Sequence, residues 1–306
     1  MHADARRERG AVAHGDDVLA RPVRGGRRPA ARVSRRGTVG LTPLELLAEL
    51  PDLPRFDLPE ELERLYGGGL GFPEPCVVAN FVQTIDGIVA LPELERSNAI
   101  IADGSEGDRF VMGLLRAAAG AILIGSATLL SSPTGTWLPE KAFPPAAASF
   151  AELRRRRGHA SPAEIAVLTT GGSLDPAHQL LERGALILTT RSAAPGIRAS
   201  VPAASEVVAV SDGDRVDPAA AIEALRRRGH SVVLSEAGPN VFGSMLAAGL
   251  VDELFLTVSP LIGGHGAGEP LSLVEGVALL PESHVRGRLL SIRRQGEHLF
   301  VRYALR

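Results

Sequence analysis

The sequence has one cysteine, one lysine, a net charge near zero and no long hydrophobic run. A single cysteine, Cys76, excludes an internal disulfide framework and any zinc or iron–sulfur site built from several cysteines. No stretch reaches the ~18 apolar residues of a membrane span, and the first residues contain no apolar signal-peptide core. The formal charge of −2 gives no reason to propose nucleic acid as a partner. We therefore expect a cytoplasmic protein that binds neither membrane nor nucleic acid.

Several common catalytic motifs are also missing. The sequence contains no G-x-x-x-x-G-K-[ST] phosphate loop, no G-x-S-x-G nucleophile turn and no H-E-x-x-H zinc helix. Pro75 and Cys76 lack the H-x-E motif and the second cysteine that a zinc deaminase needs to hold its hydroxide. No metal site is expected.

The composition of the 306 residues is that of a globular protein, with 45% hydrophobic and 22% charged residues. Residues 1–37 differ from the rest, because they carry ten arginines and four acids without hydrophobic periodicity. This pattern predicts a disordered Arg-rich tail, and a nucleic-acid or membrane tether is the weaker alternative. Residues 38–74 predict a helical leader that packs on the domain of residues 75–306. One of its helices begins at Thr42-Pro43 and a second covers Pro59–Tyr66.

Short apolar runs alternate with helical segments from Cys76 onward, which is typical of an α/β domain with a largely parallel sheet. The expected strands are Cys76–Val82, Ala121–Ile124, Ile165–Leu168, Leu186–Leu188, Val207–Val210, Val232–Leu234, Glu253–Val258, Leu289–Arg294 and His298–Leu305. The expected helices are Ser105–Ala118, Pro218–Arg228 and Pro239–Ala248. No helix separates the last two strands, and Gln295-Gly296-Glu297 between them predicts a hairpin turn, so the sheet should end in an antiparallel edge.

Two strand-to-helix junctions could hold a nucleotide phosphate. Ala121–Thr128 and Ser231–Asn240 each place a glycine turn between a buried strand and a helix start, where free N–H groups favour an anion. On this pattern alone, glycines that merely reverse the chain remain the alternative. Asp86 follows the first strand and Glu236 follows another, so two carboxylates could flank one cleft, as acid–base chemistry requires. A simple turn at Asp86 is the alternative.

Four ordered motifs carry a resemblance to a known family. Asn80–Gly87 resembles an S-L-D-G signature, and Leu115–Thr128 resembles L-R-x-x-x-D-A-I-L-V-G-x-x-T. Ser235–Pro239 corresponds to E-G-G, and Gly249–Leu254 followed by Ser259–Gly264 resembles G-L-V-D-E-L…P-x-L-x-G-G. Together they resemble the riboflavin-pathway pyrimidine reductases, the RibD C-terminal reductase domain. A stand-alone, actinobacterial-type member without a deaminase domain is the most similar type. Here Ala237 replaces a glycine and Gly120 an aspartate of the family pattern.

The resemblance implies a dihydrofolate-reductase-like three-layer fold with a mixed, mostly parallel central sheet and an antiparallel C-terminal edge. It also implies a homodimer and an NADPH-dependent reduction of 5-amino-6-(5-phosphoribosylamino)uracil, a pyrimidine ribose phosphate. Another pteridine-like substrate, as in dihydrofolate reduction, and a non-catalytic nucleotide-binding protein are the alternatives. The residues carried over as catalytic are Asp86, Glu236 and Thr84. Those for NADPH are Gly125, Ser126, Thr128, Thr169, Thr190, Gly238, Pro239 and Asn240, and those for substrate are Asn80, Asp86 and Arg109.

Overall fold

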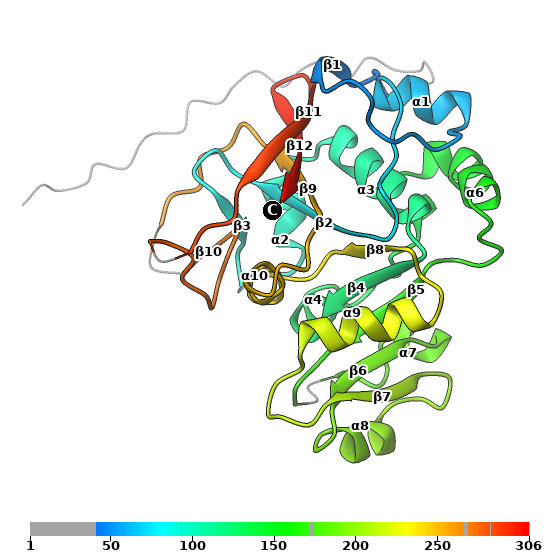
Figure 1. Ribbon diagram of the computed structural model, residues 1–306, viewed down its shortest axis with the longest axis vertical. Coiled ribbons are helices and arrows are strands. Elements are labelled where there is room, and N and C mark those ends of the chain that lie inside the picture. Colours follow the sequence, from blue (N-terminus) through cyan, green and yellow to red (C-terminus); the bar gives the residue numbers. More distant parts are fainter. Residues whose placement is uncertain (1–40, 93, 172–173, 266–268, 282, 306) are drawn as a thin grey trace, which may run out of the picture. The chain divides into compact units, whose positions relative to one another are not determined.

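Ten strands form one sheet in the part of the chain that the structure describes (Figure 1). This computed structural model describes residues 41–305 without 93, 172–173, 266–268 and 282, so the predicted tail 1–37 lies outside the described residues. The strands in spatial order are β1 (Glu45–Glu49), β11 (Gly287–Gln295), β12 (His298–Leu305), β9 (Glu253–Val258), β2 (Cys76–Gln83), β8 (Val232–Ser235), β4 (Ala121–Gly125), β5 (Glu164–Leu168), β6 (Leu186–Thr190) and β7 (Glu206–Ser211).

The sheet is mixed. All strand pairs from β9 to β7 are parallel, whereas β12, β11 and β1 join the β9 side as antiparallel strands. A separate antiparallel pair joins β3 (Ile88–Ala90) to β10 (Leu271–Ser272). The register of the last hairpin pairs Gln295 with His298, and Gly296 in the turn between them has φ +56°. The predicted mixed, mostly parallel sheet with an antiparallel C-terminal edge is confirmed.

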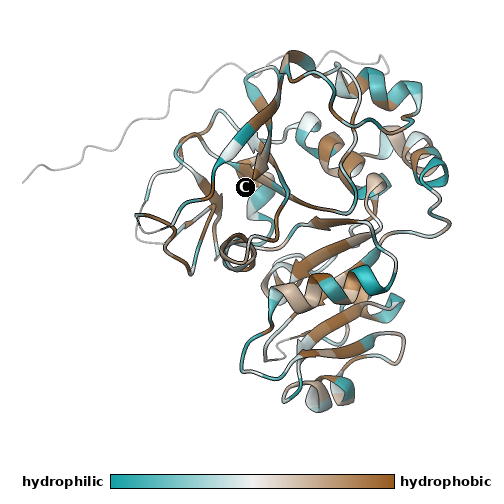
Figure 2. Cartoon of the chain, in the orientation of Figure 1, coloured by the Kyte–Doolittle hydropathy of each residue, from teal (hydrophilic) through white to brown (hydrophobic). Residues whose placement is uncertain are grey.

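Helices cover both faces of this sheet and so make three layers. Alternate side chains of a strand face opposite ways, so Ile122 and Ile124 of β4 belong to one core and Ala121 and Leu123 to the other. The first core receives side chains from α1 (Glu60–Tyr66), α3 (Glu106–Ala118), α4 (Ser126–Leu130), α6 (Ala147–Arg156), α7 (Gln179–Arg183) and α8 (Ala194–Ser200). The second receives them from α9 (Pro218–Arg227) and α10 (Pro239–Ala247). Hydropathy follows the same division, with apolar strands between helices that carry hydrophilic outer sides (Figure 2).

The remaining helical segments are short and lie between successive strands of the chain. They are α2 (Ser97–Ile101), α5 (Pro139–Ala142) and a 3₁₀ turn at Pro144–Ala146. The described residues contain no helix that is both long and apolar enough to cross a membrane.

The predicted helix at Thr42-Pro43 is wrong. Residues Glu45–Glu49 form β1, which pairs antiparallel with β11 at the edge of the sheet. Local capping signals favour a helix there. Pairing with β11 instead provides hydrogen-bond partners for the backbone of β1 and places its glutamates beside arginines of β11. Glu45 bonds Arg294 at 2.6 Å, and Glu49 bonds the buried Arg293 at 2.6 Å. The second helix of the leader is present as α1.

Candidate active site

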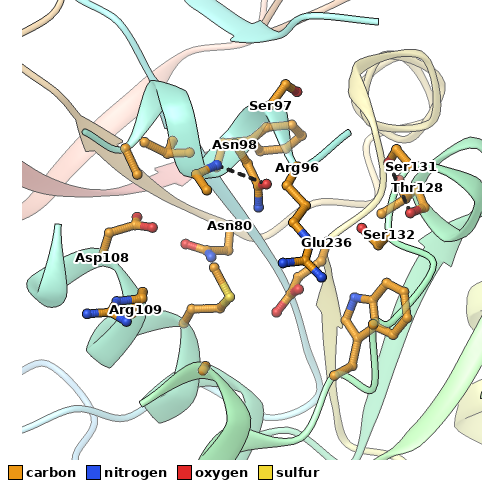
Figure 3. Close-up of a pocket in the computed structure, with 18 of the residues that line it drawn as sticks. Asn80, Arg96, Ser97, Asn98, Asp108, Arg109, Thr128, Ser131, Ser132 and Glu236 are labelled. Atoms are coloured by element: carbon orange, nitrogen blue, oxygen red, sulfur yellow. Dashed lines mark hydrogen bonds between the residues drawn. The ribbon is translucent and has the colours of Figure 1, made fainter. Parts of the chain in front are cut away.

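A cavity of about 460 Å³ opens beside the carboxyl ends of β4 and β8 (Figure 3). Its walls come from β2, from the segment that includes α2, from α3, and from the residues that follow β4 and β8. In parallel α/β sheets, ligands bind at this edge, because the loops that leave the strands converge there. The charged and amide side chains that line it are Asn80, Arg96, Asn98, Asp108, Arg109, Arg116, Lys141 and Glu236.

Glu236 and Arg116 form a two-pronged ion pair in the cavity wall. Arg116 Nε lies 2.7 Å from Glu236 Oε1, and Arg116 Nη2 lies 2.6 Å from Oε2. Arg116 belongs to the last turn of α3 and Glu236 to the turn after β8, so the pair ties helix to sheet. The two side chains are 11% and 10% exposed. The geometry matches the fork of a guanidinium to the fork of a carboxylate and leaves Glu236 fixed in orientation.

Asn80 lies on β2 and lines the same cavity. Its Oδ1 is buried and has no hydrogen-bond partner among the described residues. Buried polar atoms are nearly always paired, so an unpaired amide oxygen in a cavity wall is a position where a ligand donor would be stabilised. The predicted substrate residue Asn80 therefore lies where a ligand could meet it.

Asp108 is a cavity-lining acid whose role the sequence did not suggest. It lies in the first turn of α3, where its N–H bonds Ser105 Oγ at 3.1 Å, and only 5% of the residue is exposed. Burial raises the pKa of Asp108 to about 6, and the negative charge of Glu236 acts in the same direction. The Thr257 hydroxyl, which donates to the Asp108 carboxylate, and the charges of His298 and Arg116 limit this rise of the pKa.

The sequence does contain a signal for Asp108. Together with Val111 and Leu115 it follows the helical spacing of residues that α3 buries. A carboxylate in an apolar stripe is unusual and indicates a specific environment, because burial of a charge costs free energy.

The two predicted phosphate-binding junctions lie beside each other. A Cβ built at Gly238 would be 3.8 Å from Thr128 Oγ1, and both residues line the cavity together with Pro239. Helix α10 begins at Pro239 and has no acid in its first turn, so the positive end of its dipole is left for an anion. Ala237, which replaces a family glycine, is not among the described residues with positive φ, so its Cβ causes no backbone strain. These residues fit a dinucleotide phosphate.

Asp86 and Thr84 lie outside the residues that line the cavity. Asp86 accepts hydrogen bonds from Thr84 Oγ1 at 2.5 Å, from Gly263 N at 3.1 Å and from Gly264 N at 2.7 Å. These three donors, with the Thr84 hydroxyl first, lower the pKa of Asp86 to about 2. The carboxylate thus fastens the turn after β2 to the loop after β9.

Other predicted cofactor residues also lie at strand ends but do not line the cavity. Gly125 ends β4 and Ser126 begins α4, while Asn240 is the second residue of α10. Thr169 follows β5, and Thr190 ends β6, where its hydroxyl bonds Ser192 Oγ at 3.1 Å. The predicted cofactor residues around Thr128 and Gly238 lie at the ends of the neighbouring strands β4 and β8. Thr169 and Thr190 lie at the ends of β5 and β6, farther along the sheet.

Further cations and hydroxyls complete the cavity. Arg109, a predicted substrate residue, is half exposed and forms a weak pair with Glu106 at 3.4 Å. Arg96 and Lys141 also line the cavity, and sequence analysis did not predict them as site residues. Arg96 Nη2 lies 2.5 Å from Thr134 Oγ1, and the lining residues around that contact carry hydroxyl groups: Ser131, Ser132, Thr134 and Thr136. Figure 3 shows Ser131 and Ser132 grouped near Thr128, with Asp108 and Arg109 at the opposite side.

Several solved structures are similar to this chain in fold. A pyrimidine reductase-like protein from Corynebacterium diphtheriae is 20% identical, with a TM-score of 0.62 over 82% of this chain and 96% of that chain. A riboflavin biosynthesis reductase from Saccharomyces cerevisiae is 14% identical, with a TM-score of 0.53 over 80% and 98% of the two chains. A deaminase/reductase from Thermotoga maritima is 19% identical, with a TM-score of 0.52, and the match covers 76% of this chain but only 56% of that one.

No curated protein matches the chain. The model of the RibD C-terminal domain, however, matches residues 75–301, which is most of the sequence. The match spans the cavity-forming strands and helices from β2 to the last hairpin. The chain therefore belongs to the RibD C-terminal domain family.

Proposed function

We propose that this chain is an NADPH-dependent reductase that converts 5-amino-6-(5-phosphoribosylamino)uracil to its ribitylamino product. The observation that carries the proposal is one cavity in a RibD-type domain. The start of helix α10, which suits a phosphate, lines one side of this cavity, and polar side chains line the other. The similar protein from Thermotoga maritima is a deaminase/5-amino-6-(5-phosphoribosylamino)uracil reductase. A homodimer belongs to the proposal on the family resemblance alone, and a cytoplasmic location belongs to it on the sequence pattern alone.

The cofactor end of the cavity would be formed by the two adjacent strand–helix junctions. Thr128 and the first turn of α10 at Gly238 and Pro239 would bind the pyrophosphate, with Gly125, Ser126 and Asn240 around them. Thr169 and Thr190, at the next strand ends, are proposed for the adenosine side. When bound, NADPH supplies a hydride from its nicotinamide ring.

The opposite side of the cavity would hold the substrate. A pyrimidinedione offers N–H and C=O groups along one edge, and Asn80 can accept and donate there with its amide. The substrate phosphate requires cations, which Arg96 and Lys141 provide in the same cavity. Glu236, held by Arg116, is proposed to orient the substrate, as is Arg109. For Asp86 and Thr84 the proposed contribution is to fix the loop at Gly263 and Gly264.

The proposal is tested by following NADPH oxidation at the nicotinamide absorbance with freshly prepared substrate. Turnover with this substrate, and none with dihydrofolate, supports it. Gly238→Asp should weaken NADPH binding, because a carboxylate would enter the phosphate site at the start of α10. Gly158→Asp is the matched control, since Gly158 lies in a turn outside the lining residues with open space around it, although its φ of +76° makes it also a check on folding.

Two results would contradict the proposal in different ways. NADPH binding without turnover on any pyrimidine or pteridine substrate would favour a nucleotide-binding protein. Turnover of dihydrofolate in preference to the ribosylaminopyrimidine would keep the reductase chemistry and overturn the substrate. An unchanged NADPH dissociation constant in Gly238→Asp would remove the α10 start from the cofactor site.

A further inference from the structure

Reduction of a carbon–nitrogen double bond needs a proton as well as a hydride, so the cavity should contain a group that can give one. Among the described residues that line it, the carboxylic acids are Asp108 and Glu236. Glu236 engages Arg116 with both of its oxygens. Both carboxylate oxygens of Glu236 are thus committed to the Arg116 guanidinium rather than to a ligand in the cavity. Asp108 has no such two-pronged partner among the described residues.

The surroundings of Asp108 suit a group that changes protonation. It begins α3, and the strands packed against it present Thr257 on β9 and His298 on β12. Glu236 and Arg116 face it from the turn after β8 and from its own helix. His298 Nε2 lies 3.0 Å from the carbonyl oxygen of Ala102, so that ring is anchored to the segment before α3. Charges of both signs therefore lie near Asp108.

We propose that Asp108 is the catalytic acid that protonates the substrate during reduction. This inference rests on the proposed function. As hydride bonds to C1′ of the opened sugar, the π electron pair of the C1′–N bond moves to nitrogen. That nitrogen takes the proton of the Asp108 carboxyl group, and Asp108 is left as a carboxylate. The hydride donor loses two electrons, the substrate gains them with one proton, and water from the open cavity then reprotonates Asp108.

Three features of the structure support this role. The Thr257 hydroxyl donates to Asp108, so it can stabilise the carboxylate formed after proton transfer. Burial raises the pKa of Asp108 to about 6, so a useful fraction carries the proton at neutral pH, which is the range in which a general acid is most effective. The unpaired Oδ1 of Asn80 lies in the same cavity and could accept from a substrate N–H group, which would hold the ring beside the acid.

The experiment measures kcat and KM against pH for the full-length protein and for Asp108→Asn, with Asp103→Asn as control. Asp103 is an exposed aspartate five residues before Asp108 and outside the cavity lining, so its variant removes the same charge. For the wild type, kcat should fall as pH rises above the pKa of the acid. Asp108→Asn should lower kcat by roughly 10²–10⁴-fold and abolish that limb, with an unchanged NADPH dissociation constant. Asp103→Asn should match the wild type.

Asp108→Glu provides the second test, because it keeps a carboxylic acid. It should recover part of kcat together with a pH limb at a shifted position. If Asp108→Asn raises KM and leaves kcat and its pH limb intact, Asp108 only recognises the ring and the inference is wrong. If the wild type binds NADPH but turns over no candidate substrate, the proposed function fails and this inference with it. If the wild type turns over the substrate and Asp108→Asn keeps the wild-type kcat and pH limb, the inference fails while the proposed function stands.

Discussion

Asp86 and Asp108 are the same side chain in opposite environments. Asp86 is exposed, accepts three hydrogen bonds and has its pKa lowered to about 2. Asp108 is buried at the start of α3 and has its pKa raised to about 6. The sequence pattern draws attention to Asp86, which follows a strand and precedes a glycine. The cavity, however, is lined by Asp108.

The difference shows which physical effect decides the state of a carboxylate. At Asp86, donors from Thr84 and from two backbone amides stabilise the charge and outweigh desolvation. At Asp108, desolvation outweighs a single hydroxyl donor. A group with the first environment is suited to holding a loop in place. A group with the second is suited to exchanging a proton near neutral pH.

The largest effect should separate the two aspartates in turnover. Asp108→Asn should lose roughly 10²–10⁴-fold in kcat, the usual contribution of a general acid. Asp86→Asn should lose less, because the amide oxygen can still accept from Gly263 or Gly264 and only the loop geometry is loosened. Steady-state rates of the two variants, measured side by side, check this. If the order reverses, Asp86 carries the proton chemistry that the sequence suggested.

The two substitutions should change the free energy of unfolding in opposite directions, and the larger change is expected at Asp108. The folded-state pKa of Asp108, about 6, lies above its ordinary value of 3.8. Ionisation of this group therefore destabilises the fold increasingly as pH rises from about 4 to about 6, and it has no effect below about pH 4. Asp108→Asn should therefore raise the free energy of unfolding at pH 8, by up to about 3 kcal/mol at 1.36 kcal/mol per pKa unit. The gain should vanish near pH 4. Urea unfolding at the two pH values measures it, and a loss of stability at pH 8 would contradict the buried environment of Asp108.

A smaller effect of reversed sign is expected at Asp86. Its folded-state pKa, about 2, lies below the ordinary value of 3.8, so the charge stabilises the fold above about pH 4 and this contribution is lost as pH falls through 2. Asp86→Asn should be less stable than the wild type at neutral pH, and the two should converge in acid. Unfolding curves between pH 7 and about pH 2 test this convergence. A constant difference at every pH would show that the three donors do not hold the Asp86 charge.

The smallest expected effect concerns the neighbour of Asp108. The negative charge of Glu236 raises the pKa of Asp108, whereas the positive charge of Arg116 lowers it. Glu236→Gln removes the negative charge and leaves Arg116 without its ionic partner, so both changes lower the pKa of Asp108. The limb of the kcat–pH profile should move to lower pH. A shift to higher pH would contradict the charge arrangement around Asp108.

Much of the fold was predictable because its signals are local. Buried strands such as β4 are continuous apolar runs, and α3 carries a capping serine and an apolar stripe. The strand β1 was not predictable, because its pairing with β11 joins residues more than two hundred positions apart and overrides a local helix signal. The same logic divides the site. Thr128, Gly238 and Glu236 follow strands, so the sequence placed them at the carboxyl edge of the sheet, and the family resemblance assigned Thr128 and Gly238 to one cofactor.

Asp108 could not be predicted in the same way. Its place in the sequence, three residues after a capping serine, is ordinary for a helix start. Its special environment comes from Thr257 and His298, which belong to strands 149 and 190 residues later in the chain. Only the folded structure brings these groups around one carboxylate.

The most direct test of the account is to measure the pKa values of the aspartate side chains by carbon-13 NMR of the labelled protein. Asp86→Asn and Asp108→Asn spectra would assign the two signals. The account predicts that Asp108 titrates near pH 6 and that Asp86 stays ionised down to about pH 2. A pKa for Asp108 at or below the ordinary value of 3.8 would leave the cavity without a proton donor and would contradict the account.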